Sequence, residues 1–378
     1  MYKYSIISLF VGILFLSFQG IYQGRKLQIS SDSLRIIYSK KPSTWPKPTV
    51  DSGVEWKELG ILPVSALAAQ KDSLKDVIEL GKLFFFDPRL SGSNQISCSS
   101  CHSPDVSWTD GKEKSVGHDH AKTKRNAPSL QNIWFFKNYF WDGRAESLEQ
   151  QALGPIISEG EMNQDLNKLP KELNKIKGYL THFKKAFNHE KITKEEILYA
   201  LAIYQKTIVS RNSRFDHFLK GETDVLTDSE LQGLHLFRTK ARCINCHNGA
   251  LFSDNKFHNV GLTYYGREYQ DLGRYSVTNK PEDVGKFKTP MLRDVIRTRP
   301  WMHNGLFDDI EGVVTMYNNG MPQPKPRTEA FQKDPIFPKT SPLIKKLHLT
   351  KPEQTALISF LGSISATPFK IQAPDLPK

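Results

Sequence analysis

The amino-acid sequence predicts a mainly α-helical fold made of two similar domains with long loops. Segments with helical spacing of apolar residues are frequent, whereas the alternating patterns of strands are few. A five-residue pattern, Cys-x-x-Cys-His, occurs twice, at residues 98–102 and 243–247. Each copy follows a similar apolar segment, GKLF at residues 81–84 and GLHLF at residues 233–237, which indicates an internal duplication. The chain of 378 residues is long enough for two domains.

The repeated pattern predicts that each domain attaches a haem. Two cysteines on one turn can form thioether bonds with the vinyl groups of a porphyrin, while the histidine after them reaches the iron. A zinc site or a redox dithiol needs only the cysteine pair, but here a histidine follows both pairs and no cysteine is left over. We therefore expect two cytochrome c-like haem domains with two covalently bound c-type haems. The attachment residues are Cys98, Cys101 and the iron ligand His102 for the first haem, and Cys243, Cys246 and the iron ligand His247 for the second.

The composition is that of a globular protein, with 38% hydrophobic and 24% charged residues. The formal charge of +12 is lower in the assembled protein, because each haem brings two propionates. Basic residues are spread along the chain and no nucleic-acid motif accompanies them, so we expect no nucleic-acid partner. A basic surface would help an acidic redox partner to dock.

Residues 1–24 begin with a positive charge at Lys3 and continue as an apolar run, which is typical of a secretory signal peptide. An uncleaved membrane anchor remains the alternative, because residues 17–20 lack a small-x-small cleavage pattern. Export to the periplasm agrees with the haem motifs, since c-type haem attachment is normally completed outside the cytoplasm. Residues 25–60 are polar and contain several prolines, so they are expected to form a linker or an extension.

The two haem domains are expected at residues 61–222 and 223–378. Apolar residues at helical spacing predict a helix over residues 75–85, which Asp87 and Pro88 should end. The other helix signals are a start at Ser147 with an end at Gly154 and Pro155, and capping boxes at Thr193–Glu196 and Thr227–Glu230.

Five further motifs occur in order along the chain: LFFFDPRLS at 83–91, RNAPSL at 125–130, FWDGR at 140–144, GEM at 160–162 and WMHNG at 301–305. Together with the two haem patterns they resemble the bacterial di-haem cytochrome c peroxidases and their MauG relatives, which oxidise protein side chains. The resemblance covers residues 60–365. It implies an oxidoreductase of the cytochrome-c peroxidase type.

The resemblance implies three catalytic residues near the first haem. His118 matches a distal histidine that caps the iron in the oxidised enzyme and swings away on activation; otherwise it is a histidine of a surface loop. Trp141 matches a tryptophan that lies between the two haems and shortens the electron-transfer steps, although core packing would also explain it. Glu161 matches a distal glutamate that moves the proton during peroxide cleavage, and Pro155 matches a proline packed over the same pocket.

Two neighbouring residues are candidates for the sixth ligand of the second haem. The resemblance implies a methionine in the peroxidases and a tyrosine in the MauG branch, fourteen residues after the position of His303. That count falls on Tyr317, with Met316 directly before it. Neighbouring residues of a helix point about 100° apart, so only one of them faces the iron, and the register favours Tyr317.

The resemblance also implies a calcium ion between the domains, held by an asparagine side chain and two backbone carbonyls. The matching residues are Asn126, Thr298 and Pro300.

Three functions follow from these expectations. The first is an exported peroxidase that reduces hydrogen peroxide to water with electrons from a small donor protein, either a cytochrome c or a cupredoxin. The second is a MauG-like enzyme that oxidises side chains of a partner protein, which Tyr317 favours. The third is a pure electron-transfer cytochrome, against which Glu161 and the loop around His118 argue. Dimers are common in the family, so a homodimer is one assembly to expect.

Overall fold

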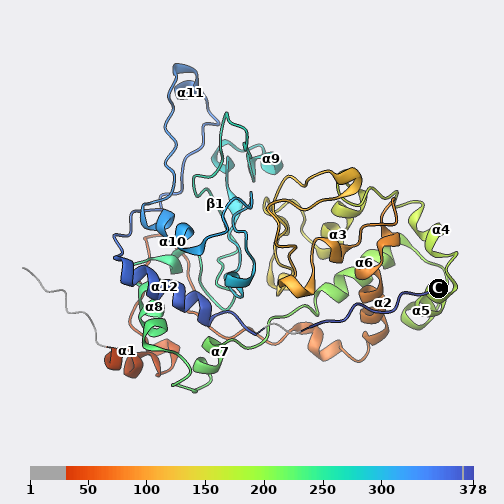
Figure 1. Ribbon diagram of the computed structural model, residues 1–378, viewed down its shortest axis with the longest axis horizontal. Coiled ribbons are helices and arrows are strands. Elements are labelled where there is room, and N and C mark those ends of the chain that lie inside the picture. Colours follow the sequence, from red (N-terminus) through yellow and green to blue (C-terminus); the bar gives the residue numbers. More distant parts are fainter. Residues whose placement is uncertain (1–30, 368–369) are drawn as a thin grey trace, which may run out of the picture.

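The structure, a computed structural model, describes residues 31–367 and 370–378 and confirms a mainly helical fold (Figure 1). The predicted signal peptide or anchor at residues 1–24 lies outside the described residues. The α-helices are α1 (Ser31–Tyr38), α2 (Lys75–Phe86), α3 (Leu148–Ile157), α4 (Leu169–Leu173), α5 (Lys177–Phe187), α6 (Lys194–Gln205), α7 (Arg214–Leu219), α8 (Asp228–Arg238), α9 (Tyr275–Thr278), α10 (Ile310–Asn318), α11 (Glu329–Lys333) and α12 (Lys351–Ser363). Two short strands, β1 (Phe257–His258) and β2 (Phe287–Lys288), pair in antiparallel register. Within the described ranges, no helix is long and apolar enough to span a membrane.

Two hydrophobic cores divide the described chain into two domains, which lie side by side in Figure 1. The buried members of the first core run from Val77 to Ile208 and include side chains of α2, α3, α4, α5 and α6. The second core contains side chains of α1, α7, α8, α10 and α12. Phe215 and Phe218 of α7 are buried in this second core. The chain therefore changes core between residues 208 and 215, shortly before the boundary expected at 222.

Residues 31–60, which the sequence analysis treats as a linker or extension, pack against the second domain. Leu34 and Tyr38 of α1 are buried in the second core. The apolar residues of α1 do have helical spacing, but the prolines that follow made the segment resemble a linker. Arg238 of α8 is fully buried, pairs with Glu58 and donates a hydrogen bond to the Tyr38 hydroxyl. The segment is thus fixed by both apolar and charged contacts.

Each domain is organised around a pair of crossing helices with a glycine at the contact. In the first domain Gly81 of α2 faces α6, and a Cβ added to it would overlap the backbone carbonyl of Ala200. In the second domain Gly233 of α8 faces α12, and a Cβ there would overlap the carbonyl of Ala356. Both glycines belong to the segments that repeat in the sequence. The same helix crossing occurs in both domains, which agrees with a duplication.

Replacing Gly233 with Ala is expected to lower the free energy of unfolding by about 1–3 kcal/mol, because α8 and α12 must move apart to admit a methyl group. The matched control is Gly362→Ala on α12, where nothing lies within 4 Å of the added Cβ. It should be neutral, or stabilising by up to about 1 kcal/mol. Thermal unfolding of the two holoproteins makes the comparison. Equal melting temperatures for both variants would contradict the close helix contact.

The helix boundaries follow the sequence signals, with one exception. α2 ends directly before Asp87, as expected. The capping box of α8 has both of its bonds, from the Glu230 amide to the Thr227 hydroxyl and from the Thr227 amide to the Glu230 carboxylate. The expected end of α3 at Pro155 is wrong. This helix continues for one more half-turn, because a proline in the last turn removes only one hydrogen bond and the next residue, Ile156, is buried in the first core.

The C-terminal tail returns from the second domain to the first, where its end lies beside α5 (Figure 1). The Arg89 guanidinium donates a hydrogen bond to the carbonyl of Pro377 at 3.0 Å, and the amide of Gly178 donates to the carbonyl of Lys378 at 3.0 Å. Arg89 lies in the turn that leads from α2 toward the first haem motif. The tail is therefore attached close to the part of the first domain that carries this motif.

Candidate functional site

In both Cys-x-x-Cys-His motifs the first three residues form a short 3-10 turn, which the second cysteine ends and the histidine follows. Nδ1 of His102 lies 3.1 Å from the carbonyl oxygen of Trp108, and Nδ1 of His247 lies 2.9 Å from that of Phe252. A carbonyl only accepts, so Nδ1 carries the proton and Nε2 of each ring is left to bind a metal. Burial lowers the pKa of both histidines, which keeps the rings neutral as iron ligation requires.

The four cysteines are free thiols. Burial raises the pKa of Cys98, Cys243 and Cys246 to about 12, which disfavours the thiolate that a zinc site needs. Among the described residues, one trio of metal-binding side chains gathers, Cys246 with Asp254 and His258. Asp254 and His258 already pair at 2.7 Å. The environment of the cysteines therefore fits thioether attachment of a haem.

The loop that carries His118 and the turn that carries Glu161 are joined near the first motif. The amide of His118 donates to the carbonyl of Glu161 at 2.9 Å, and a Cβ on Gly117 would overlap the carbonyl of Gly160. Nδ1 of His118 is buried without a hydrogen-bond partner, as expected of a side chain that awaits a ligand. Burial raises the pKa of the Cys101 thiol, and the nearby Glu161 carboxylate adds to the rise. The structure thus brings His118 and Glu161 to the first attachment turn.

The environment of Glu161 favours proton transfer. Burial raises the pKa of its carboxyl, and the positive charge of Arg144 opposes the rise. Arg144 is held by Asp142 at 3.0 Å and lies over the ring of Phe140, 3.4 Å from its centre. A carboxyl with a raised pKa can both accept and return a proton more readily than an exposed one at neutral pH.

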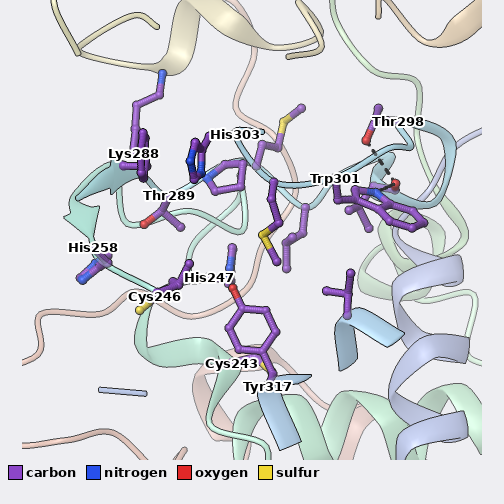
Figure 2. Close-up of a pocket in the computed structure, with 18 of the residues that line it drawn as sticks. Cys243, Cys246, His247, His258, Lys288, Thr289, Thr298, Trp301, His303 and Tyr317 are labelled. Atoms are coloured by element: carbon purple, nitrogen blue, oxygen red, sulfur yellow. Dashed lines mark hydrogen bonds between the residues drawn. The ribbon is translucent and has the colours of Figure 1, made fainter. Parts of the chain in front are cut away.

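A cavity of about 290 Å³ adjoins the second motif (Figure 2). Cys243, Cys246 and His247 line it, and Tyr317 of α10 directs its hydroxyl toward His247. Burial raises the pKa of Tyr317, and the two neighbouring cysteines contribute to the rise. Met316 does not line the cavity. Of the two candidates, Tyr317 is therefore the one that faces the second motif.

Trp141 reaches the same cavity from the first domain. Its indole N–H donates to the carbonyl of Asn126 at 2.9 Å, and its own carbonyl accepts from the amide of Lys288 at 2.8 Å. The indole lies edge-on to the ring of His303, with 6.4 Å between the ring centres. Trp141 is therefore fixed at the boundary of the two domains by contacts with both.

The three residues expected to hold calcium, Asn126, Thr298 and Pro300, line this cavity too. The amide nitrogen of Asn126 donates to the carbonyl of Lys112 at 2.8 Å, which leaves the amide oxygen to face a cation. An amide oxygen with two backbone carbonyls is a donor set that suits calcium better than a transition metal.

Residues around Trp141 and residues around His303 form a second internal repeat, which was not predicted from the sequence. Matched residues are 162 positions apart, as Pro128 and Pro290 are. The matched pairs include Tyr139 and Trp301, Phe140 and Met302, Trp141 and His303, Gly143 and Gly305, and the helix caps Ser147 and Asp309. The backbone repeats as well, because an isolated bridge joins Tyr139 to Ala145 and another joins Trp301 to Phe307. Positive φ angles also repeat at two of these pairs, Phe140 with Met302 and Gly143 with Gly305.

The repeat bears on the ligand of the second haem. At the same separation Tyr317 matches Pro155, the residue that the family resemblance places over the first haem. Met316 matches Gly154 instead. The shared pattern Pro-x-Leu-x-Asn/Asp at 128–132 and 290–294 was the signal in the sequence that could have revealed this register.

A chain with two such attachment turns is a di-haem cytochrome of the c type. More narrowly, it belongs to the di-haem cytochrome c peroxidase family, whose model matches residues 75–224. Members of this family are oxidoreductases, so the chain is an enzyme of the peroxidase type that binds two c-type haems.

Relatives of both branches are similar to this chain. The methylamine utilization protein MauG of Methylophilus methylotrophus is 35% identical over 303 residues, which are 79% of this chain and 85% of that protein. The cytochrome-c peroxidase IdrP2 of Denitromonas iodatirespirans is 33% identical over 345 residues, which are 84% of this chain and 89% of that protein. A solved structure of a MauG-like protein associated with microbial copper homeostasis has a TM-score of 0.70 and 28% identity, and covers 84% of this chain and 96% of its own.

Proposed function

We propose that the chain is an exported di-haem peroxidase that reduces hydrogen peroxide to water with electrons from a small donor protein, a cytochrome c or a cupredoxin. The observation that carries the proposal is the position of Glu161. Its half-buried carboxyl lies beside the first attachment turn, and its backbone carbonyl is bonded to the loop of His118. An electron carrier with two permanent iron ligands has no use for such a carboxyl. In this proposal the protein works in the periplasm.

Glu161 is the proton carrier of the reaction. Its carboxylate takes the proton from the inner oxygen of bound peroxide and returns it to the outer oxygen, so that water can leave. Arg144 limits the rise of the Glu161 pKa that burial causes, so the carboxylate remains available as a base. The bound haem supplies the redox chemistry.

His118 controls access to the first iron. Its loop is held by the Glu161 carbonyl through a single hydrogen bond at residue 118, and one buried ring nitrogen has no partner within the protein. With a haem bound, the ring would cap the iron in the resting enzyme and would leave when the loop moves. Trp141 then carries electrons between the two haem sites, because it lines the second cavity while belonging to the first domain.

A MauG-like activity on a partner protein is the second candidate, and the position of Tyr317 favours it. A phenolate ligand lowers the potential of a haem, whereas a thioether raises it. Tyr317 lines the second cavity and Met316 does not. In this variant of the proposal, oxidising equivalents from peroxide pass through Trp141 to side chains of a protein bound near the second domain.

We also propose that Asn126, Thr298 and Pro300 hold one calcium ion between the domains. The ion would fix the loop that accepts the Trp141 N–H to the loop that carries His303. Removal of the ion by a chelator should therefore loosen the domain boundary before it affects either attachment turn.

A redox titration of the holoprotein that follows the two haems separately tests which of the two activities applies. If the potentials are widely separated and one is clearly positive, the second haem has a methionine ligand and the enzyme is a peroxidase that activates by half-reduction. If both potentials are low and close, Tyr317 is the ligand and oxidation of a protein partner is favoured. A holoprotein that binds neither cyanide nor peroxide would refute both and leave an electron carrier.

A further inference from the structure

Lys288 of β2 is a charged residue at the domain boundary that the proposed reaction does not use. Its backbone amide donates to the carbonyl of Trp141 at 2.8 Å, and its side-chain Nζ donates to the carbonyl of Asn138, also at 2.8 Å. The same Nζ lies 4.1 Å from the centre of the Phe136 ring. One residue of the second domain therefore holds both ends of the segment 136–141 of the first. In Figure 2 its side chain extends away from Cys246, His247 and Tyr317.

The positive charge of the Lys288 ammonium is only weakly balanced by negative charge nearby. The charge of the Asp142 carboxylate favours the ammonium. The oxygens of Asp142 are already bonded to Arg125 at 2.5 Å and Arg144 at 3.0 Å. Burial lowers the pKa of Lys288 to about 7, so the side chain is charged below neutral pH and loses its charge above it.

The other charged side chains on and next to β1 and β2 form ion pairs that do not involve Lys288. Directly before β2, the side chain of Lys286 pairs with Asp283 at 3.1 Å. On β1, His258 pairs with Asp254 at 2.7 Å. The contacts of the Lys288 ammonium are therefore with the first domain rather than with its own ladder.

The 162-residue repeat gives these contacts a counterpart. Lys288 matches Asn126, Asn138 matches Pro300, and Phe136 matches Thr298. The backbone bonds are reciprocal, because the amide of Asn126 donates to the carbonyl of His303 at 2.8 Å, as that of Lys288 does to Trp141. The ammonium thus lies among the residues that match the three expected calcium ligands.

We propose that Lys288 is a positioning residue of the electron relay: its charged side chain fixes segment 136–141, which carries Trp141, to the second domain. In the 162-residue repeat, its ammonium corresponds in position to the calcium ion proposed above. The proposal rests on the relay function proposed above for Trp141. The step it serves moves one electron from the second haem to the first; Trp141 ends as it began, and no bond or proton changes.

Lys288→Met removes the ammonium and keeps the length of the side chain. In the holoprotein, amide hydrogen exchange of residues 136–142 should become about ten-fold faster, as the loss of a hydrogen bond from a charged group implies. Electron transfer between the haems, followed by absorbance after rapid reduction of the second haem, should slow several-fold. Both haems stay attached. Lys286→Met, which removes a charge two residues earlier in the chain, is the matched control and should change neither quantity.

The charge state provides a second test that a purely structural contact would not pass. As the pH rises through about 7, Lys288 loses its proton and its contacts with Asn138 and Phe136 weaken. Electron transfer between the haems should therefore slow in the wild type. Lys288→Arg stays charged over this range and should give a flat pH profile with wild-type exchange protection.

Two results would overturn the proposal: exchange and electron transfer in Lys288→Met equal to those of Lys286→Met, or the same pH profile in the wild type and Lys288→Arg. Trp141→Phe separates this failure from that of the relay. If Trp141→Phe does not slow electron transfer between the haems, the relay is wrong. If it does while the Lys288 variants behave as wild type, only the function of Lys288 is wrong.

Discussion

Glu161→Gln is expected to keep both haems attached and to reduce peroxide turnover by about 10²–10⁴-fold, the usual contribution of a positioned acid–base group. The amide has nearly the shape of the carboxyl but cannot take a proton from the inner oxygen of peroxide. The measurement is steady-state oxidation of a reduced cytochrome c by hydrogen peroxide, together with the absorbance change of the ferric protein when peroxide is added. Both should be lost together, because the same proton transfer precedes them.

Glu159→Gln is the matched control for this prediction. Glu159 lies two residues earlier on the same turn and is exposed, so its replacement removes the same charge without changing the buried site. It should retain wild-type turnover. Unchanged turnover in Glu161→Gln would remove Glu161 from the reaction, and the observation on which the proposed function rests would then have a structural explanation only.

Tyr317→Phe should open the sixth position of the second iron. The phenylalanine keeps the ring in the cavity but has no oxygen to donate, so the second haem should become high-spin and bind cyanide. The spectrum of the first haem should remain that of the wild type, because Tyr317 lines only the cavity of the second motif among the sites described above. Electron paramagnetic resonance of the ferric protein distinguishes the two haems.

Met316→Leu provides the comparison for Tyr317→Phe. It replaces the neighbouring thioether, which does not line the cavity, with an apolar side chain of similar volume. Its second haem should stay low-spin. The opposite pattern, a high-spin haem in Met316→Leu and no change in Tyr317→Phe, would show that α10 turns its other face to the iron in the loaded protein.

Much of the fold could be predicted from local signals. The α8 cap at Thr227 and the end of α2 at Asp87 depend on a few adjacent residues, and the structure has both where the sequence indicates them. α1 was missed because it is short and is followed by prolines, and its burial depends on contacts with Arg238 and the second core, far along the chain. The end of α3 was misplaced because tertiary burial of Ile156 outweighed the local signal of Pro155.

The residues of the candidate site divide in the same way. Cysteine and histidine spacing identifies the two attachment turns, since the haem chemistry requires neighbours in the sequence. Lys288 has no local signal of this kind. Its surroundings are assembled by bonds between chain segments of different domains, such as that from Lys288 to Trp141. Comparison of the chain with itself at a separation of 162 residues was a route to it from sequence.

The return of the C-terminal tail to the first domain creates contacts between residues that are far apart in the sequence. Arg89 bonds to Pro377 and Gly178 bonds to Lys378, so each contact joins residues about two or three hundred positions apart. Contacts this far apart in sequence form late, because closing so long a loop is slow. The turn after α2, which carries Arg89, is therefore expected to gain this contact only late in folding.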